Sequence, residues 1–316
     1  MDDTKARRRS QAGHPQPRPL TRAGAGFVAI AVVVFAIVWI ISMGSFAKTP
    51  TNDSTSAPPP PNGVVATLQL DDFAARDDKL SVILRLKATG NLIDTRDALV
   101  SEMSISAYGA DGIKEFVYEK GRSISSQPLE LVAEGHVSDY PSDVYNGNVT
   151  IYAEQLFRGP TGEIVKSVDV PVSLGTASSV GGWNTTINAP TAPSTDAAAT
   201  IHLERTTFTK IFSWFLIAMI AVLPLFTVVI SILFLTNRRL VEVDHLGWFV
   251  ALLLALPFLR SILPGDPPIG ARIDVAVFFW CLAAAIVATA IGIVAWYRQS
   301  RERLLAEREK LRLGSD

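Results

Sequence analysis

The sequence predicts a membrane protein that combines an α-helical bundle of four spans with an extracytoplasmic all-β sandwich domain. Three observations predict this class. Four apolar stretches approach the roughly 20 residues that a helix needs to cross a bilayer. Residues 48–210, between the first and second stretch, alternate apolar and polar side chains with the period of β-strands. Basic residues gather at both ends of the chain, beside the first and last stretches.

The N-terminal part consists of a basic tail, residues 1–22, and a first predicted span, residues 25–45. The tail has six basic side chains against two acidic ones, which favours a cytoplasmic N-terminus. A cleaved signal peptide is the alternative, because Ser45-Phe46-Ala47 offers the small residues that a signal peptidase accepts. The apolar stretch exceeds the usual length of roughly 7–15 residues in a signal peptide, which favours a retained anchor. Both alternatives place the following segment outside.

The next part is a Pro-rich stalk, residues 48–63, followed by the predicted β domain, residues 64–208. Four consecutive prolines, residues 58–61, favour an extended and semi-rigid stalk. Short alternating runs rich in β-branched residues then predict about eight strands, which favours a two-sheet sandwich. These runs are residues 65–70, 80–88, 101–108, 113–119, 128–134, 148–157, 163–172 and 199–206. Since the last run leads almost directly into the second span, we expect a stiff connection between domain and helices.

The remaining predicted spans are residues 211–235, 246–263 and 273–297, with Pro224 and Pro257 inside the second and third. Residues 298–316 form a second basic tail, which we expect to continue the last helix into the cytoplasm. Alternation across the membrane places both termini in the cytoplasm and residues from about 46 to 209 outside. Fourteen of the 29 Lys and Arg residues then lie in the three cytoplasmic segments, and only one in the short outer loop. This distribution follows the positive-inside rule for short loops.

Charge and cysteine content exclude several classes of function. Residues 48–210 carry 20 acidic and 13 basic side chains, which argues against a nucleic-acid partner for this domain. The basic tails suit the anionic inner leaflet of a lipid bilayer. The single cysteine, Cys281, lies in the last span, so neither a disulfide nor a thiolate metal site can form within the chain.

Motifs for catalysis or cofactor binding are absent from the sequence. It contains no G-x-S-x-G, H-E-x-x-H or G-x-x-x-x-G-K-[ST] pattern. Only His136 and His202 fall in the predicted β domain, and two histidines are too few for a zinc site. The acidic run at residues 71–78 lacks the spaced ligands and glycine of a calcium loop, which favours a solvated turn between strands. We therefore predict no catalytic residue, no cofactor and no metal site.

Arg260 and Asp274 are the charged residues closest to the predicted hydrocarbon region, and they flank one short outer loop. Charged groups in spans are costly and are candidates for function. We predict an ion pair that locks the hairpin, because snorkelling at the interface removes most of the cost. A role in transport is the alternative.

Two segments carry a family resemblance. The first is Asp139-Tyr140-Pro141-Ser142-Asp143-Val144-Tyr145, in which Ser142 replaces the usual Phe, and the second is the hairpin segment 259–270, followed by Asp274. On these motifs the chain, from about residue 64 to 297, resembles the domain of unknown function 4436 family of actinobacterial and fungal multi-span membrane proteins. The resemblance implies a membrane protein of this topology and no activity. It marks these candidates for a structural role: Tyr140, Pro141, Asp143, Tyr145, Arg260, Pro264, Gly265, Pro267, Pro268 and Asp274.

The expected function is that of a non-enzymatic envelope protein. Its outer sandwich would bind a partner, namely another membrane protein or an envelope glycan or lipid, and its spans would anchor it in the cell membrane. A subunit of a transporter or channel is the alternative, with Pro224, Pro257 and the Arg260–Asp274 pair lining a pathway. An enzyme that acts on an envelope lipid would need carboxylates or histidines that converge only in the fold. The oligomeric state is not predicted.

Overall fold

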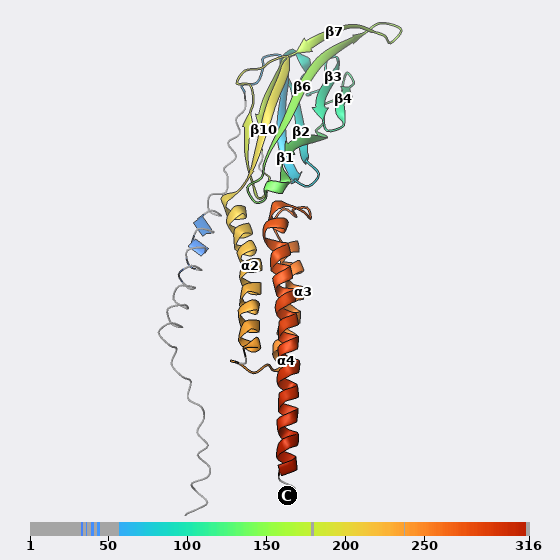
Figure 1. Ribbon diagram of the computed structural model, residues 1–316. Coiled ribbons are helices and arrows are strands. Elements are labelled where there is room, and N and C mark those ends of the chain that lie inside the picture. Colours follow the sequence, from blue (N-terminus) through green and yellow to red (C-terminus); the bar gives the residue numbers. More distant parts are fainter. Residues whose placement is uncertain are drawn as a thin grey trace, which may run out of the picture. The chain divides into compact units, whose positions relative to one another are not determined.

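The computed structural model describes residues 57–177, 180–236 and 238–313, together with six positions between residues 33 and 44 (Figure 1). Two compact units divide the chain, residues 1–47 and 48–316, and all the elements below belong to the second. The basic tail at residues 1–22 and the start of the stalk lie outside the described residues. The predicted first span, residues 25–45, lies almost wholly outside them.

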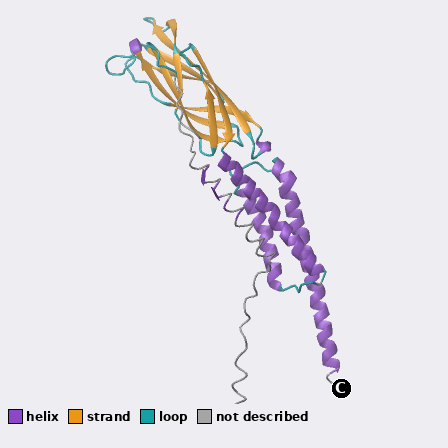
Figure 2. Ribbon diagram, turned by 90° about the vertical axis from the view of Figure 1, so that its left-hand side faces the viewer, coloured by secondary structure: helices purple, strands orange, loops and turns teal. Residues whose placement is uncertain are grey.

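The β domain contains ten strands among the described residues, drawn in orange in Figure 2. Strands are present in every segment where the alternating pattern predicts one. The run at residues 163–172 is broken into two strands at Pro171, which has no N–H to donate, and one further strand, β9, was not predicted. The strands are β1 Gly63–Ala74, β2 Lys79–Thr89, β3 Glu102–Gly109, β4 Gly112–Tyr118, β5 Gln127–Gly135, β6 Val144–Arg158, β7 Ile164–Val170, β8 Val172–Thr176, β9 Trp183–Asn188 and β10 Asp196–Arg205.

Backbone hydrogen bonds join these strands into one large mixed sheet. One part has the order β8-β1-β2-β5, with β8 parallel to β1. The other part is built on the long strand β6, which pairs with β3, β7 and β10, while β4 and β9 extend it at β3 and β10. Strand β5 connects the two parts, since its beginning pairs with β2 and its last three residues pair with β6.

Alternate residues of the strands fill one hydrophobic core. On β10 the buried side chains are Ala197, Ala199, Ile201 and Leu203, and the residues between them are more exposed. The same period on β6 buries Tyr145, Val149 and Ile151. Both sets belong to one cluster that also includes residues of β1, β2, β3, β5 and β8. The β prediction is therefore confirmed as a large mixed sheet around a single core.

Three helices among the described residues are long and apolar enough to cross a membrane, judged by length and composition. They are α2 Thr207–Leu235, α3 Val243–Ser261, and α4 Phe279–Leu313, which follows a π-helical turn at Asp274–Phe278. Thr206 caps α2, because its Oγ1 accepts a hydrogen bond from the N–H of Thr209 at 3.2 Å. The predicted continuation of the last helix beyond residue 298 is confirmed up to Leu313.

Polar side chains join the helices where they pack. Ser231 on α2 donates to the carbonyl oxygen of Ala288 on α4 at 2.8 Å. Gln299 on α4 holds the connection between α2 and α3. Its Oε1 accepts from the N–H of Val241 at 2.9 Å, and its Nε2 donates to the carbonyls of Phe234 and Arg239 at 3.2 Å each.

Candidate functional site

The candidate site lies where the sheet meets the loop between α3 and α4, around Arg205. Arg205 ends β10, two residues before α2 begins. Glu204 pairs with Val144 in the register of β10 and β6, so Arg205 and Asp143 follow as the next cross-strand neighbours. On its other side, Arg205 pairs with Trp183 of β9. The strand register therefore brings Asp143, Arg205 and Trp183 to one end of the sheet.

Arg205 and Asp143 form a buried, bidentate ion pair. Nε of Arg205 donates to Oδ1 of Asp143 at 2.5 Å, and Nη2 of Arg205 donates to Oδ2 at 2.8 Å. The two side chains are 2% and 0% exposed. A charge so far from water is tolerated only with a well-aligned partner and further hydrogen bonds. Tyr145 supplies one of these, because its hydroxyl donates to Oδ2 of Asp143 at 3.1 Å.

Aromatic rings enclose the guanidinium of Arg205. Its Cζ lies 4.7 Å from the ring centroid of Tyr140 and 4.5 Å from that of Trp183, which is the range of cation–π contacts. Trp183 also contacts Phe73 and Tyr145 edge to face. Since these three rings belong to the main core, the ion pair is attached directly to the packed interior of the sheet.

Arg205 and Tyr140 also contact the helical part of the chain. Nη1 of Arg205 donates to the carbonyl oxygen of Pro264, in the loop after α3, at 3.2 Å. The hydroxyl of Tyr140 donates to Oγ of Ser213 on α2 at 2.7 Å. The ring of Tyr140 packs in a small apolar cluster with residues of α2 and the hairpin: Leu216, Ile217, Leu263 and Ile273. We call Tyr140, Asp143, Arg205, Ser213, Pro264 and Gly265 the junction.

Two exposed ion pairs border the junction. Arg272 donates to Asp139 at 2.8 Å, and Arg76 lies 3.9 Å from Asp266. Solvent-exposed pairs of this kind contribute little to stability. The buried contacts of Arg205 and Tyr140 are therefore the ones that hold the sheet to the helices.

The predicted pair of Arg260 and Asp274 is present and forms a second buried network within the hairpin. Nε and Nη2 of Arg260 donate to the two carboxylate oxygens of Asp274 at 3.1 and 2.9 Å. Nη2 also donates to the carbonyls of Pro267 and Pro268, and the N–H of Gly270 donates to Asp274 at 2.8 Å. These contacts close the outer loop upon itself, as a hairpin lock requires.

Burial changes the acidity of both tyrosines at the junction. Removal from water raises the pKa of Tyr140 above that of a free phenol. The pKa of Tyr145 is also raised, first by burial and then by the negative charge of the neighbouring Asp143. Both phenols are therefore held in the neutral form, in which they donate hydrogen bonds.

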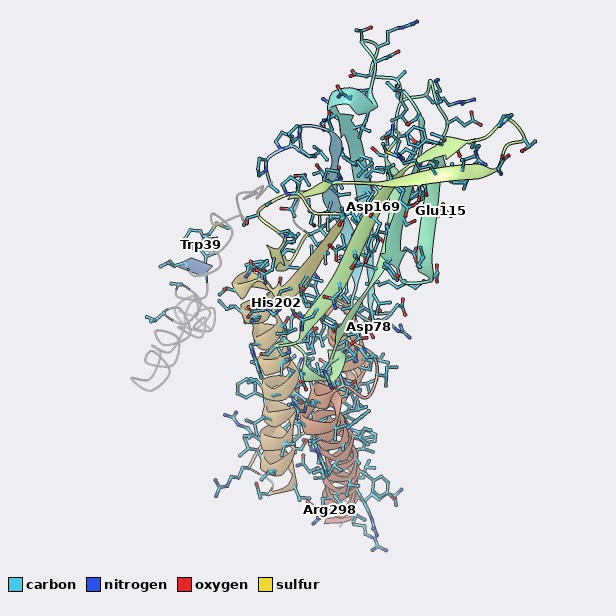
Figure 3. The ribbon with its side chains drawn as sticks, turned by 90° about the horizontal axis from the view of Figure 1, so that it is seen from above. Trp39, Asp78, Glu115, Asp169, His202 and Arg298 are labelled. Atoms are coloured by element: carbon cyan, nitrogen blue, oxygen red, sulfur yellow. The ribbon has the colours of Figure 1, made fainter. Side chains whose placement is uncertain are left out.

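The structure does not bring the two histidines and the acidic run of the β domain together into a site. His202 projects from β10, where its Nδ1 lies 2.8 Å from Oδ1 of Asn146 (Figure 3), whereas His136 follows β5. In the acidic run, residues 71–74 continue β1 and the turn comes only after them. Across the described ranges, no group of three or more His, Cys, Asp or Glu side chains is placed to hold a metal ion. The absence of a cofactor stays a prediction.

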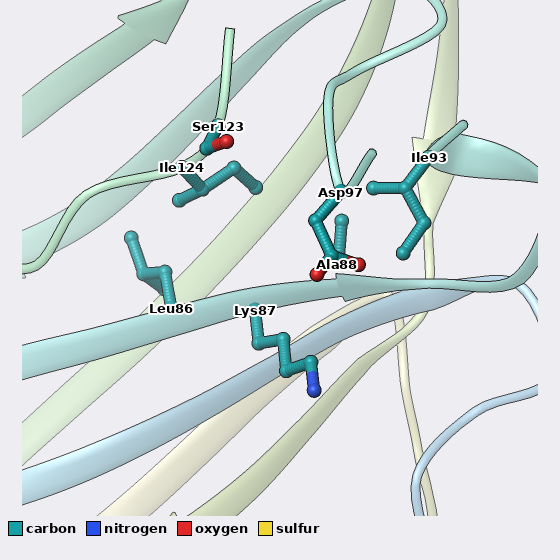
Figure 4. Close-up of a pocket in the computed structure, with 7 residues that line it drawn as sticks. All are labelled: Leu86, Lys87, Ala88, Ile93, Asp97, Ser123 and Ile124. Carbon is teal, nitrogen blue, oxygen red and sulfur yellow. The ribbon is translucent and has the colours of Figure 1, made fainter. Parts of the chain in front are cut away.

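A small cavity of about 140 Å³ lies elsewhere on the β domain (Figure 4). Figure 4 shows Lys87 on the other side of β2 from Leu86 and Ala88, so the ammonium group does not face the cavity. The other residues that line it are Leu86, Ala88, Ile93, Asp97, Ser123 and Ile124, of which Asp97 and Ser123 are polar. At the junction, by contrast, Arg205 and Asp143 hydrogen-bond to each other, and Arg205 also donates to the carbonyl oxygen of Pro264. This arrangement suits a rigid joint rather than proton transfer.

Two family models match the chain. Residues 54–203 match the model described as Domain of unknown function (DUF4436), and residues 205–299 match Domain of unknown function (DUF8686). A search of curated proteins found no match. The resemblance is thus confirmed for the β domain, whereas the hairpin motif, which we had assigned to the same family, falls within the second model. The boundary between the models lies beside Arg205, so the junction joins two separately recognised parts.

Proposed function

Because this chain belongs, through residues 54–203, to the DUF4436 family, whose description names no activity, we propose its function from the geometry of the junction. The protein is a non-enzymatic component of the cell envelope. Its β domain, a sandwich on the outer side of the membrane, binds a partner and is held in a fixed position by the helices. The partner is another membrane protein or an envelope glycan or lipid.

The proposed topology has four spans, with residues 25–45 as the first and both termini in the cytoplasm. Three apolar helices and the basic residues after α2 and along the end of α4 support it. Residues from about 46 to 209 are then extracytoplasmic. Reporters fused at position 120 and at the C-terminus test this topology, and they are expected to report opposite sides of the membrane. The same side for both would contradict it.

The observation that carries the proposal is the buried pair of Arg205 and Asp143 with its contact to Pro264. A domain tethered only by a strand-to-helix connection would need none of these contacts. Here the sheet, α2 and the α3–α4 loop share one set of buried hydrogen bonds, which keeps the binding surface at a constant orientation to the membrane.

Crosslinking in intact cells tests the binding role. A photoreactive amino acid at exposed positions of the β domain is expected to capture a defined partner, and the same residue on the cytoplasmic end of α4 serves as the control. Capture of nothing beyond this chain at any outer position would contradict the proposal.

A transporter or channel subunit is the second candidate, supported by Pro224 and Pro257 within α2 and α3. Flux through liposomes that contain the purified chain would favour it. Against it, the charged pair nearest the membrane is engaged within its own loop, since Arg260 contacts Asp274 and two carbonyls. We therefore place partner binding first.

A further inference from the structure

The outer face of β6, β10 and β9 carries two rows of uncharged polar side chains. Strand register aligns Asn148, Thr200 and Asn188 in one row, and Asn146, His202 and Thr186 in the next. All six point away from the core and are exposed or half-exposed. Figure 3 labels His202 within this face. We call these six residues the polar rows.

Hydrogen bonds within the rows orient the carboxamides. Oγ1 of Thr200 donates to Oδ1 of Asn148 at 3.1 Å, and Nδ1 of His202 lies 2.8 Å from Oδ1 of Asn146. The carboxamide oxygens of Asn146 and Asn148 are therefore engaged, which leaves their amide nitrogens to donate to a ligand. A carboxamide has two N–H donors, so each of these asparagines can donate to hydroxyl groups of a ligand.

Charge separates the rows from the rest of the domain. Residues 48–210 carry 20 acidic and 13 basic side chains, whereas the rows carry no formal charge with His202 neutral. Glu204 and Asp196 border them on β10. An anionic ligand would be repelled by this surrounding, which includes Glu134 of β5 in register with Asn146, and none of the six side chains in the rows is a carboxylate that would attract a cationic ligand. An uncharged, hydroxyl-rich ligand is the best match.

An aromatic pair adjoins the rows on the same face. Tyr152 of β6 and Tyr108 of β3 contact each other edge to face, with ring centroids 6.2 Å apart. They are 37% and 46% exposed. A tyrosine ring offers an apolar surface with a polar edge, and this suits the aliphatic face and hydroxyl rim of a pyranose sugar. Protein-binding patches, by contrast, are usually apolar at their centre.

We propose that the polar rows together with Tyr108 and Tyr152 form a binding face for a neutral glycan of the envelope. A face spread over adjacent strands admits an extended sugar chain, whose rings would contact the tyrosines and whose hydroxyls would contact the asparagines. This inference rests on the proposed function and specifies its partner.

Titration calorimetry of the full chain in nanodiscs tests the glycan face. The probes are maltohexaose, cellohexaose and mannohexaose, with hexagalacturonate as the anionic comparison. At least one neutral hexasaccharide is expected to bind, and hexagalacturonate at least tenfold more weakly. The double variant Tyr108→Ala, Tyr152→Ala is expected to weaken binding at least tenfold. Phe157→Ala, which removes an exposed aromatic from the same strand, is the matched control and leaves binding unchanged.

A second variant keeps the test independent of the tyrosines. Asn146→Asp with Asn148→Asp preserves side-chain size but removes the amide donors, and it is expected to weaken binding by a similar factor. Absence of binding by every neutral sugar, equal binding of hexagalacturonate, or binding unaffected by both double variants would each overturn the inference. If crosslinking in cells captures a protein while no sugar binds, partner binding survives and the glycan face does not.

Discussion

A Cβ atom on Gly265 would lie 2.3 Å from Nη1 of Arg205, so the hairpin loop approaches the end of β10 as closely as the atoms permit. Gly265 also has φ +79°, in the left-handed region. Glycine is therefore required at this position for two separate reasons, and each can be measured.

Substitution of Gly265 by alanine is expected to destabilise the protein by displacing the Arg205 guanidinium from its contact with Pro264. Gly270 lies in the same loop with φ +97° and has open space around it, so Gly270→Ala measures backbone strain alone. That strain costs roughly 1–3 kcal/mol. Thermal unfolding followed by circular dichroism should show the larger fall in Tm for Gly265→Ala. Equal falls would mean that the close approach to Arg205 does not matter.

Removal of one partner of the buried ion pair should be costly. Arg205→Met or Asp143→Leu leaves an uncompensated charge in the interior, which typically costs about 3–5 kcal/mol. The double variant Arg205→Met, Asp143→Leu should lose less than the two single losses combined, because no lone charge remains. Arg272→Met, on an exposed pair, is the control and should cost at most about 1 kcal/mol. Losses that simply add would argue against direct coupling of Arg205 and Asp143.

Much of the fold follows from local patterns. Alternation along single strands and apolar length along single helices were sufficient to locate the three long apolar helices and every strand except β9. The sequence did not predict that β5 connects the two parts of the sheet or that β9 extends it. Both features depend on which strands pair, and composition carries little information about pairing between strands far apart in the sequence. Strand β9 has only six residues, and Asn and Thr are prominent among them, so its sequence signal for a strand is too weak to be recognised.

The sequence identified some residues of the candidate site but not all of them. Tyr140, Asp143, Pro264 and Gly265 stood out through the family resemblance, but Arg205, which joins them, was missed. A signal existed: Ile201, Leu203 and Arg205 have the same parity on β10, so the strand period points the arginine into the core. Such a buried charge demands a partner. Which acid provides it depends on the register with β6, and the sequence does not specify that register.

Charge exchange tests the hairpin lock. Arg260→Asp and Asp274→Arg should each reduce the amount of folded protein, because two like charges would then meet in a buried site. The double exchange should restore part of that loss. Restoration will be incomplete, since Pro267, Pro268 and Gly270 are arranged for the original orientation of donors and acceptor. Membrane fractions quantified by immunoblot provide the measurement. Complete failure of rescue would argue that the two residues act separately.

Alkaline titration tests the burial of the tyrosines. Burial raises the pKa of Tyr118, Tyr140 and Tyr145, so the folded state keeps protons that the unfolded chain releases above pH 10. Stability is therefore unaffected below about pH 9 and falls as pH rises above 10. Absorbance at 295 nm should show late ionisation that coincides with unfolding, and Tyr140→Phe should remove one late step. Ionisation of all six tyrosines near pH 10 in the folded protein would refute this.

At the opposite end of the helices, Gln299 holds the connection between α2 and α3. Gln299 is 6% exposed and both ends of its carboxamide are used, so no water molecule can readily replace it. Gln299→Leu should leave the buried N–H of Val241 without its acceptor and remove the donor to the carbonyls of Phe234 and Arg239, at a cost of roughly 1–3 kcal/mol for the buried N–H.

The connection should then open, and trypsin should cleave after Arg238 or Arg239 faster than in the unaltered protein. Gln299→Glu keeps an acceptor for Val241 but loses the donor, so its cleavage rate should fall between the two. Arg298→Gln, at the neighbouring exposed position, is the control for altered charge near the cleavage site. If Gln299→Leu resists trypsin as well as the unaltered chain, the connection is held by the packing of Val241 and Phe249 rather than by the carboxamide.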